Sequence, residues 1–256
     1  MTETEVRFEL ERAITENQLV LHYQPRVLLS DLTLRGVEAL VRWRHPTRGI
    51  VPPAELIAAA ERSGLMKDLE SWVIRETVLQ AAVWRKDGVR TGVGVNVGAA
   101  LLHDEPFLRL FERTLKMHGD PETFIFEVSA ASLSATDRPD AGLARLRQRG
   151  VRLALDDVTT PAELTRASWF HWDYVKAGRG LVGGAAHDPG TETALRALIA
   201  QSTELGARVQ AVGAEDDATI ALLRDAGAYS VQGYVISPPL GVKELWAWSE
   251  GRRRAM

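Results

Sequence analysis

Short apolar runs alternate with longer amphipathic stretches along most of the chain. The apolar runs predict strands, and the stretches with apolar residues three to four positions apart predict helices. Strands that alternate with helices pair in parallel through right-handed crossovers. About eight such strands favour a closed TIM-like (β/α)8 barrel of the α/β class over an open sheet. The predicted strands are 19–26, 33–42, 91–97, 124–128, 151–155, 173–177, 208–212 and 229–232, and the predicted helices are 5–16, 52–62, 67–86, 106–118, 137–149, 161–170, 190–205, 216–226 and 242–250.

The length of 256 residues suits one barrel domain over 1–256, with the barrel at about 19–240 between helices 5–16 and 242–250. The chain has no cysteine, which excludes disulfides, thiolate metal sites and cysteine nucleophiles. A net charge of −3 gives no case for binding a nucleic-acid polymer. No apolar run is long enough for a membrane span, and the acidic start is unlike a signal peptide. We therefore expect a cytoplasmic protein whose regulatory input comes from a ligand or a partner.

Polar residues occur where the predicted strands end. Because the carboxyl ends of parallel barrel strands form one mouth, these side chains are expected to converge there. Their oxygen atoms, without sulfur or paired histidines, favour Mg²⁺, Mn²⁺ or Ca²⁺ over Zn²⁺ or copper. Each residue alone also fits a helix cap, a turn, an ion pair or a surface charge, so these alternatives stay open. The residues are Glu38, Asn96, Glu127, Asp156, Asp157, Lys176 and Gln232.

Several motifs resemble the signature of EAL domains over roughly residues 19–240. They are Tyr23-Gln24-Pro25, Glu38-Ala39-Leu40-Val41-Arg42-Trp43, Arg44-His45-Pro46 and Pro53-Ala54-Glu55-Leu56-Ile57. The resemblance implies a metal-dependent phosphodiesterase fold that acts on the bacterial messenger cyclic di-GMP. Mg²⁺ or Mn²⁺ would serve the reaction, and Ca²⁺ would bind without turnover.

The resemblance also implies a role for each matching residue. The first metal would be held by Glu38, Asn96, Glu127 and Asp156. Asp156 would bridge to a second metal held by Asp157, and Lys176 would lie beside the attacking water. The nucleotide would be bound by Gln24, Leu40 and Arg42, with Gln232 near the metal-bound water.

The chain departs from the family pattern around the second metal. Ala130, Gly178 and Val212 stand where the family has acids. The loop 156–161 lacks both family glycines, so it must follow another path, because threonine does not readily adopt a positive φ. Valine offers no oxygen to a metal or a water, and we therefore do not expect a complete second metal site.

Three functional hypotheses follow. The first is a cyclic di-GMP receptor with weak or no hydrolysis, because contacts to the ground state are kept while transition-state contacts are lost. The second is an active phosphodiesterase that releases linear pGpG. The third is an interaction scaffold that binds neither nucleotide nor metal, with tryptophans 169, 172, 246 and 248 as interface candidates. A homodimer through the barrel edge near loop 156–161 and an unidentified protein partner complete the expected interactions.

Overall fold

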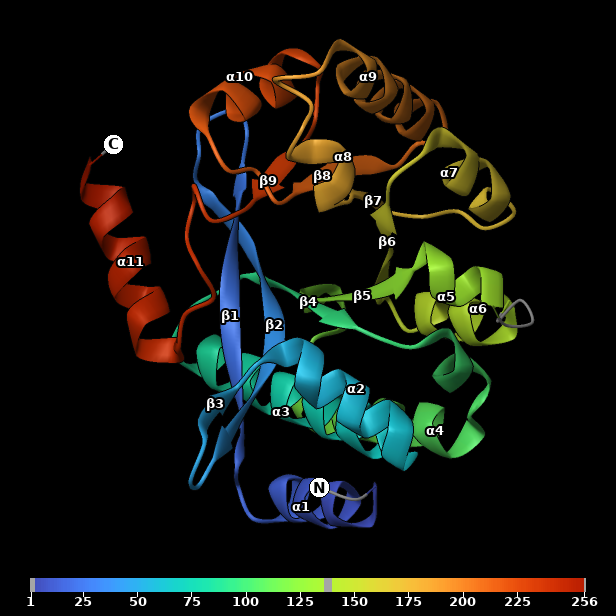
Figure 1. Cartoon of the computed structure of the whole chain (residues 1–256), viewed down its shortest axis with the longest axis vertical. Helices are drawn as coiled ribbons and strands as arrows, with labels where there is room; N and C mark the ends of the chain where they lie inside the picture. The colour runs from blue at the N-terminus through green and yellow to red at the C-terminus, as the bar shows by residue number, and fades with distance from the viewer. Residues whose placement is uncertain (1–2, 136–139, 256) are drawn as a thin grey trace.

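The computed structural model describes residues 3–135 and 140–255. Strands and helices alternate after an initial hairpin, as Figure 1 shows. The strands are β1 (Leu19–Leu28), β2 (Leu34–His45), β3 (Gly49–Val51), β4 (Gly92–Asn96), β5 (Phe124–Ser129), β6 (Arg152–Val158), β7 (Tyr174–Ala177), β8 (Arg208–Val212) and β9 (Ser230–Gln232). The helices are α1 (Glu3–Thr15), α2 (Pro53–Ser63), α3 (Met66–Lys86), η1 (Ala99–His103), α4 (Glu105–His118), η2 (Pro121–Thr123), α5 (Ala130–Ala135), α6 (Asp140–Gln148), α7 (Pro161–Ala167), α8 (Arg179–Val182), α9 (Pro189–Glu204), α10 (Asp217–Asp225) and α11 (Val242–Ala255).

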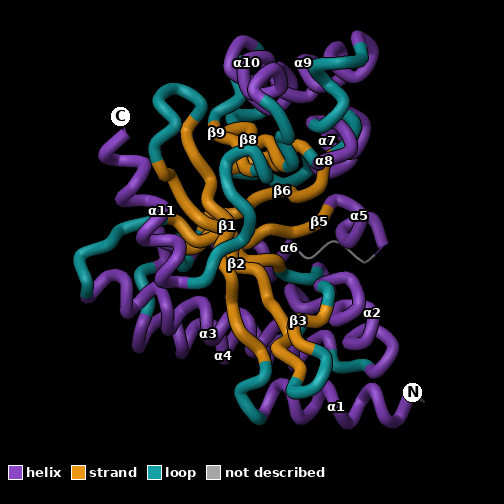
Figure 2. Tube along the Cα trace, turned by 60° about the vertical axis from the view of Figure 1, so that its left-hand side comes forward, coloured by secondary structure: helices purple, strands orange, loops and turns teal. Residues whose placement is uncertain are grey.

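The sheet closes on itself and forms a barrel. Its order is β1-β9-β8-β7-β6-β5-β4-β2-β3, and an additional β1–β2 pairing completes the ring, leaving β3 on the outer edge of β2. The strands gather at the centre and the helices lie outside them, as Figure 2 shows. The predicted α/β barrel is thus confirmed.

Within the closed ring, strand β1 is the exception to parallel pairing, because it runs antiparallel to both β2 and β9; outside the ring, β3 also pairs antiparallel with β2. A short turn rather than a helix joins β1 to β2, and a connection of that length permits only an antiparallel pair. The other neighbours from β2 through β4 to β9 pair in parallel.

Most element boundaries match the prediction closely, and the differences involve short elements. Strand β3 and helices α5, α8, η1 and η2 were not predicted, since a turn or two carries too little periodicity. The helix predicted at 161–170 ends at Ala167, and the helix predicted at 242–250 continues to Ala255. Positions 137–139 of the helix predicted at 137–149 lie outside the described residues.

The core has two parts with different chemistry. Outward-facing strand residues such as Val37 and Ala39 pack under the helices and are buried. The barrel interior is polar, because Arg26, Glu38, Glu127, Lys176, Gln210 and Gln232 are all buried there. Buried charges persist only when they are paired or bind a ligand, so the barrel interior is where the chemistry of this fold must be sought.

Among residues 3–135 and 140–255, no helix is both long enough and apolar enough to cross a membrane.

Candidate metal centre at the barrel mouth

Three carboxylates converge at the carboxyl ends of the strands, which we call the mouth. Glu38 on β2, Glu127 on β5 and Asp156 on β6 each place an oxygen within 4.8 Å of the others, and we call them the carboxylate cluster. The strand register accounts for this, because Glu38 pairs with Gly94, and Asn96 on the same strand pairs with Glu127. Among the described residues, this cluster is the group of three acids whose oxygen atoms lie close enough together to bind one metal ion.

Gly94 makes room for the carboxylate of Glu127. A Cβ atom at position 94 would lie 2.1 Å from Glu127 Oε1 and 2.8 Å from its Cδ, which is too close for any side chain. The missing side chain at position 94 therefore leaves the Glu127 carboxylate the space that it occupies inside the barrel. This is the physical reason for a glycine inside a strand.

Lys176 on β7 lies among the three acids and neutralises part of their charge. Its Nζ is 3.4 Å from Glu38 Oε2 and 3.0 Å from Asp156 Oδ2, and it donates a hydrogen bond to Glu127 Oε2 at 2.5 Å. The lysine side chain is almost fully buried. Burial lowers the pKa of Lys176, but the three carboxylates outweigh it and hold that pKa above the usual value. Lys176 is therefore a fixed cation beside the candidate metal site.

The pKa values of two cluster acids move in opposite directions. Burial raises the pKa of Glu127 to about 7, with repulsion from Glu38 and Asp156 adding to it. Burial also acts to raise the pKa of Glu38, but Lys176 and two side-chain amides outweigh it and lower that pKa. Metal ligands must be deprotonated, so a cation would bind this cluster more tightly as Glu127 ionises.

A chain of side-chain amides orients Glu38. Asn96 Nδ2 donates to Glu38 Oε1 at 2.9 Å, and Gln232 Nε2 donates to Glu38 Oε2 at 2.7 Å. Gln232 also donates to Gln24 Oε1 at 2.9 Å, and Gln24 in turn donates to the backbone oxygen of Ser237. The structure therefore brings four sequence-predicted residues, Gln24, Glu38, Asn96 and Gln232, into one hydrogen-bonded network.

Leu40 and Arg42 lie farther along β2, beyond the cluster. Only residues 36–39 of β2 pair with β4, so the strand continues past the barrel rim with β1 as its neighbour. Both side chains are half-buried, and they share the strand face of Glu38 because the side-chain period is two. They are placed where a ligand above the cluster would meet them.

Asp157 does not join the cluster. Its φ is +53°, and a Cβ at position 178 would lie 2.3 Å from its Oδ1, so its carboxylate fills the space over Gly178. Burial, and then Asp156, raise the pKa of Asp157. The sequence analysis predicted Asp157 as a ligand of a second metal, and that role stays a prediction; in this structure its carboxylate lies beside Gly178.

The loop after Asp157 follows the alternative path that its composition required. Thr160 begins helix α7 in a capping box, in which its side chain accepts from the amide of Glu163 and Glu163 accepts from the Thr160 amide. Among the described non-glycine residues, positive φ occurs at Asn17, Leu32 and Asp157, so Thr159 and Thr160 avoid it.

The three positions that lack acids lie around this loop and the mouth. Val212 is half-buried at the end of β8, opposite Gln232 in the strand register. It faces the barrel interior, since Gln210 two residues earlier points inward. Ala130 is buried at the start of α5, and Gly178 follows β7.

The sequence analysis missed two interior residues. Arg26 Nη1 donates to Gln210 Oε1 at 2.7 Å and to Glu127 Oε1 at 3.3 Å. Arg26 lies two residues after Gln24, and Gln210 two residues before Val212. Polar residues at period two in otherwise apolar strands were the available signal.

The donor set fits one hard divalent cation. Three carboxylates within 4.8 Å, with the amide of Asn96 at the rim, are the oxygen ligands that Mg²⁺, Mn²⁺ and Ca²⁺ prefer. These ligands come from four strands of a rigid barrel, β2, β4, β5 and β6, so they are held before a cation arrives.

Comparison with known proteins identifies the family to which this arrangement belongs. The EAL domain family matches residues 7–239. The cyclic di-GMP phosphodiesterase PA2567 of Pseudomonas aeruginosa is 33% identical over 250 residues, 91% of this chain and 40% of that protein. The cyclic di-GMP phosphodiesterase PdeR of Escherichia coli is 31% identical over 242 residues, 93% of this chain and 36% of that protein. This chain thus spans well under half the length of these relatives.

Solved structures show the same barrel. The PaMucR phosphodiesterase in complex with c-di-GMP matches with a TM-score of 0.84 and 29% identity, covering 94% of this chain and 99% of that chain. The FimX EAL domain of Xanthomonas citri, also in complex with c-di-GMP, matches in fold with a TM-score of 0.85 and 21% identity, covering 93% of this chain and 95% of that chain. With its barrel, its mouth carboxylates and a family match over nearly its full length, the chain belongs to the EAL domain family.

Proposed function

We propose that this chain binds cyclic di-GMP at the barrel mouth through one divalent cation and hydrolyses it weakly or not at all. The observation that carries the proposal is the composition of the mouth. Glu38, Glu127 and Asp156 form one cation site, while Asp157 is turned toward Gly178 and Val212 offers no oxygen.

The contacts that would hold the nucleotide are present. Gln24, Leu40 and Arg42 lie at or beyond the rim near the carboxylate cluster. A bound cation would neutralise the phosphate and reduce its repulsion from the acids. A solved relative that is 29% identical binds c-di-GMP, and that likeness supports the same ligand here.

The contacts that would speed hydrolysis are incomplete. Phosphodiester cleavage by this kind of site benefits from two cations that stabilise both the attacking and the leaving oxygen. A residue whose loss removes about 2.7–4 kcal/mol of transition-state stabilisation slows a reaction about 100- to 1,000-fold. Because positions 178 and 212 both lack a carboxylate, turnover should fall while binding is retained.

A working phosphodiesterase is the alternative, and a specific observation favours it. Curated relatives at 33% and 31% identity are named cyclic di-GMP phosphodiesterases. This alternative requires Asp157 to leave Gly178 and join the cluster when metal and substrate bind.

The scaffold hypothesis lacks a comparable observation. Trp172 is buried, and Trp169, Trp246 and Trp248 are half-buried and packed against the core. Trp246 also makes an edge contact with Trp84, with ring centroids 5.2 Å apart. These tryptophans therefore contribute to packing.

One sample tests binding and turnover together. Calorimetry with cyclic di-GMP in Ca²⁺ should show one-site binding, and chromatography after incubation in Mn²⁺ should show little or no linear product. Glu38→Gln should abolish nucleotide binding, while Glu204→Gln, at an exposed acid far from the mouth, should leave it intact. Rapid metal-dependent release of linear dinucleotide that Glu38→Gln abolishes would establish the phosphodiesterase instead.

Restoring acids tests the reason given for slow turnover. Val212→Glu combined with Gly178→Asp should raise the hydrolysis rate at least tenfold if the missing oxygens limit it. If wild type binds the nucleotide tightly and this double variant still does not cleave it, the slow hydrolysis would instead be attributed to loop 156–161.

A further inference from the structure

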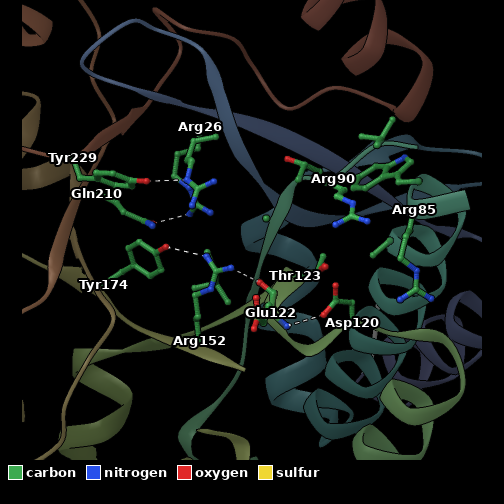
Figure 3. Close-up of a pocket in the computed structure, with 17 residues that line it drawn as sticks. Arg26, Arg85, Arg90, Asp120, Glu122, Thr123, Arg152, Tyr174, Gln210 and Tyr229 are labelled. Carbon is green, nitrogen blue, oxygen red and sulfur yellow. Dashed lines mark hydrogen bonds between the residues drawn. The ribbon is translucent and has the colours of Figure 1, made fainter. Parts of the chain in front are cut away.

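A cavity lies at the opposite end of the barrel from the mouth. Its lining includes residues at the amino ends of the parallel strands, such as Gly92 on β4, Arg152 on β6 and Tyr174 on β7. The cavity has a volume of about 260 Å³ and is shown in Figure 3. We call it the amino-end cavity. None of its lining residues belongs to the carboxylate cluster.

The amino-end cavity is strongly basic. Five arginines and two acids line it, and the arginines are Arg26, Arg35, Arg85, Arg90 and Arg152. Within the part of the chain that the structure describes, only Arg26 of these five has a carboxylate within ion-pair distance. A concave site with several uncompensated guanidinium groups attracts an anion and is well suited to phosphate oxygens.

Neutral groups orient two of the arginines that lack an acid, Arg35 and Arg152. Arg35 Nε donates to the hydroxyl of Tyr229 at 2.8 Å. Arg152 donates to the hydroxyl of Tyr174 at 3.2 Å and to the backbone oxygen of Glu122 at 2.6 Å. Figure 3 shows Arg152, Tyr174 and Tyr229 around the same space. These bonds fix the side chains without neutralising them, so the positive charge remains available to a ligand.

Two buried polar atoms in the lining have no protein partner. Arg26 is 2% exposed, and its Nε donates to no acceptor in the described residues. The hydroxyl of Thr91 is likewise buried without a hydrogen-bond partner. Leaving a buried donor unpaired costs about 1–3 kcal/mol, and more for a charged group, so each unpaired donor needs an explanation. Because both atoms are closed to solvent, an acceptor in the amino-end cavity would reach them only after a side-chain movement.

From this charge, geometry and pairing we infer that the amino-end cavity is a binding site for a small phosphate-bearing anion. Ligand pockets for drug-sized molecules span about 300–1,000 Å³. A cavity of about 260 Å³ therefore fits pyrophosphate or a short phosphate ester, and not a cyclic dinucleotide. The same Arg26 that lines this cavity reaches Glu127 with Nη1, so the ligand would lie one side chain away from the carboxylate cluster.

Calorimetry of the full chain with inorganic pyrophosphate in a metal-free buffer tests the inference. One anion should bind per chain, and binding should weaken with added salt because the contact is charge-assisted. Arg90→Gln should weaken binding on the order of tenfold, which is the loss of one charged hydrogen bond. Arg90 is exposed, so this variant keeps the fold, and thermal unfolding confirms that.

Two further variants locate the anion. Arg113→Gln removes an exposed arginine on α4 that does not line the cavity, and its affinity for pyrophosphate should equal that of wild type. Arg42→Gln removes the arginine at the mouth and should also leave the affinity unchanged. No measurable binding by folded wild type would overturn the inference. The inference would also be overturned if the double variant Arg90→Gln/Arg152→Gln still bound pyrophosphate while Arg42→Gln did not, because the anion would then bind at the mouth.

Discussion

Replacing Gly94 with alanine tests how the carboxylate cluster is built. The new Cβ would lie 2.1 Å from Glu127 Oε1, whereas unstrained contacts between carbon and oxygen are about 3.3 Å or longer. The carboxylate would therefore have to move by roughly 1.2 Å. It is held by Lys176 on one oxygen and by Arg26 on the other, so this movement breaks a buried ion pair.

The expected cost follows from those contacts. Overpacking alone costs about 1–3 kcal/mol, and breaking a buried ion pair about 3–5 kcal/mol. We expect Gly94→Ala to lower the free energy of unfolding by about 3–5 kcal/mol and to weaken Ca²⁺ binding at least tenfold. Urea denaturation followed by circular dichroism measures the first quantity, and calorimetry measures the second.

A matched control lies on the same strand. A Cβ at Gly92 would meet no atom closer than 3.8 Å, so the free energy of unfolding of Gly92→Ala should lie within about 1 kcal/mol of that of wild type. In a Glu127→Ala background the clash partner is gone, and adding Gly94→Ala should then cost less than about 1 kcal/mol. If Gly94→Ala is as stable and binds Ca²⁺ as tightly as Gly92→Ala, the proposed packing of Glu127 is wrong.

Three further predictions concern charge and loop geometry. Burial raises the pKa of Glu70 to about 7, so its neutral form stabilises the fold below pH 4.5 and that stability is lost as the pH rises to about 7. At pH 8, Glu70→Gln should therefore raise the free energy of unfolding by about 1–2 kcal/mol, after allowance for partial exposure, and the melting temperature should rise with it. At pH 4 neither quantity should rise. Lys176→Met should leave Glu38 and Asp156 without their cation and lower stability by about 3–5 kcal/mol, with Ca²⁺ restoring much of the loss. A melting temperature that Ca²⁺ does not change would argue against a cation site. Gly178→Ala should displace the Asp157 carboxylate and change the affinity for metal. Gly180→Ala is the control, because a Cβ there would lie 4.0 Å from the nearest atom and should leave the affinity unchanged. Equal affinities for the two variants in calorimetry would contradict this geometry.

The sequence by itself determined the barrel and most of the candidate site. The alternation of apolar runs with amphipathic stretches predicts parallel strands, because side-chain periodicity depends on local backbone geometry. Parallel strands in a barrel end at one mouth, and this rule alone places Glu38, Glu127 and Asp156 together. The antiparallel direction of β1 was not predicted, because the barrel pattern implies parallel pairing throughout.

Only the tertiary structure decided where individual side chains point within that frame. Whether Asp157 joins the cluster depends on the empty space over Gly178, which lies 21 residues further along the chain. The need for glycine at position 94 depends on a carboxylate from the neighbouring strand. The basic cavity at the amino ends gathers arginines from β1, β2, β6, α3 and the segment before β4. Contacts between residues distant in sequence depend on register and packing, and these are properties of the closed sheet that no local pattern contains.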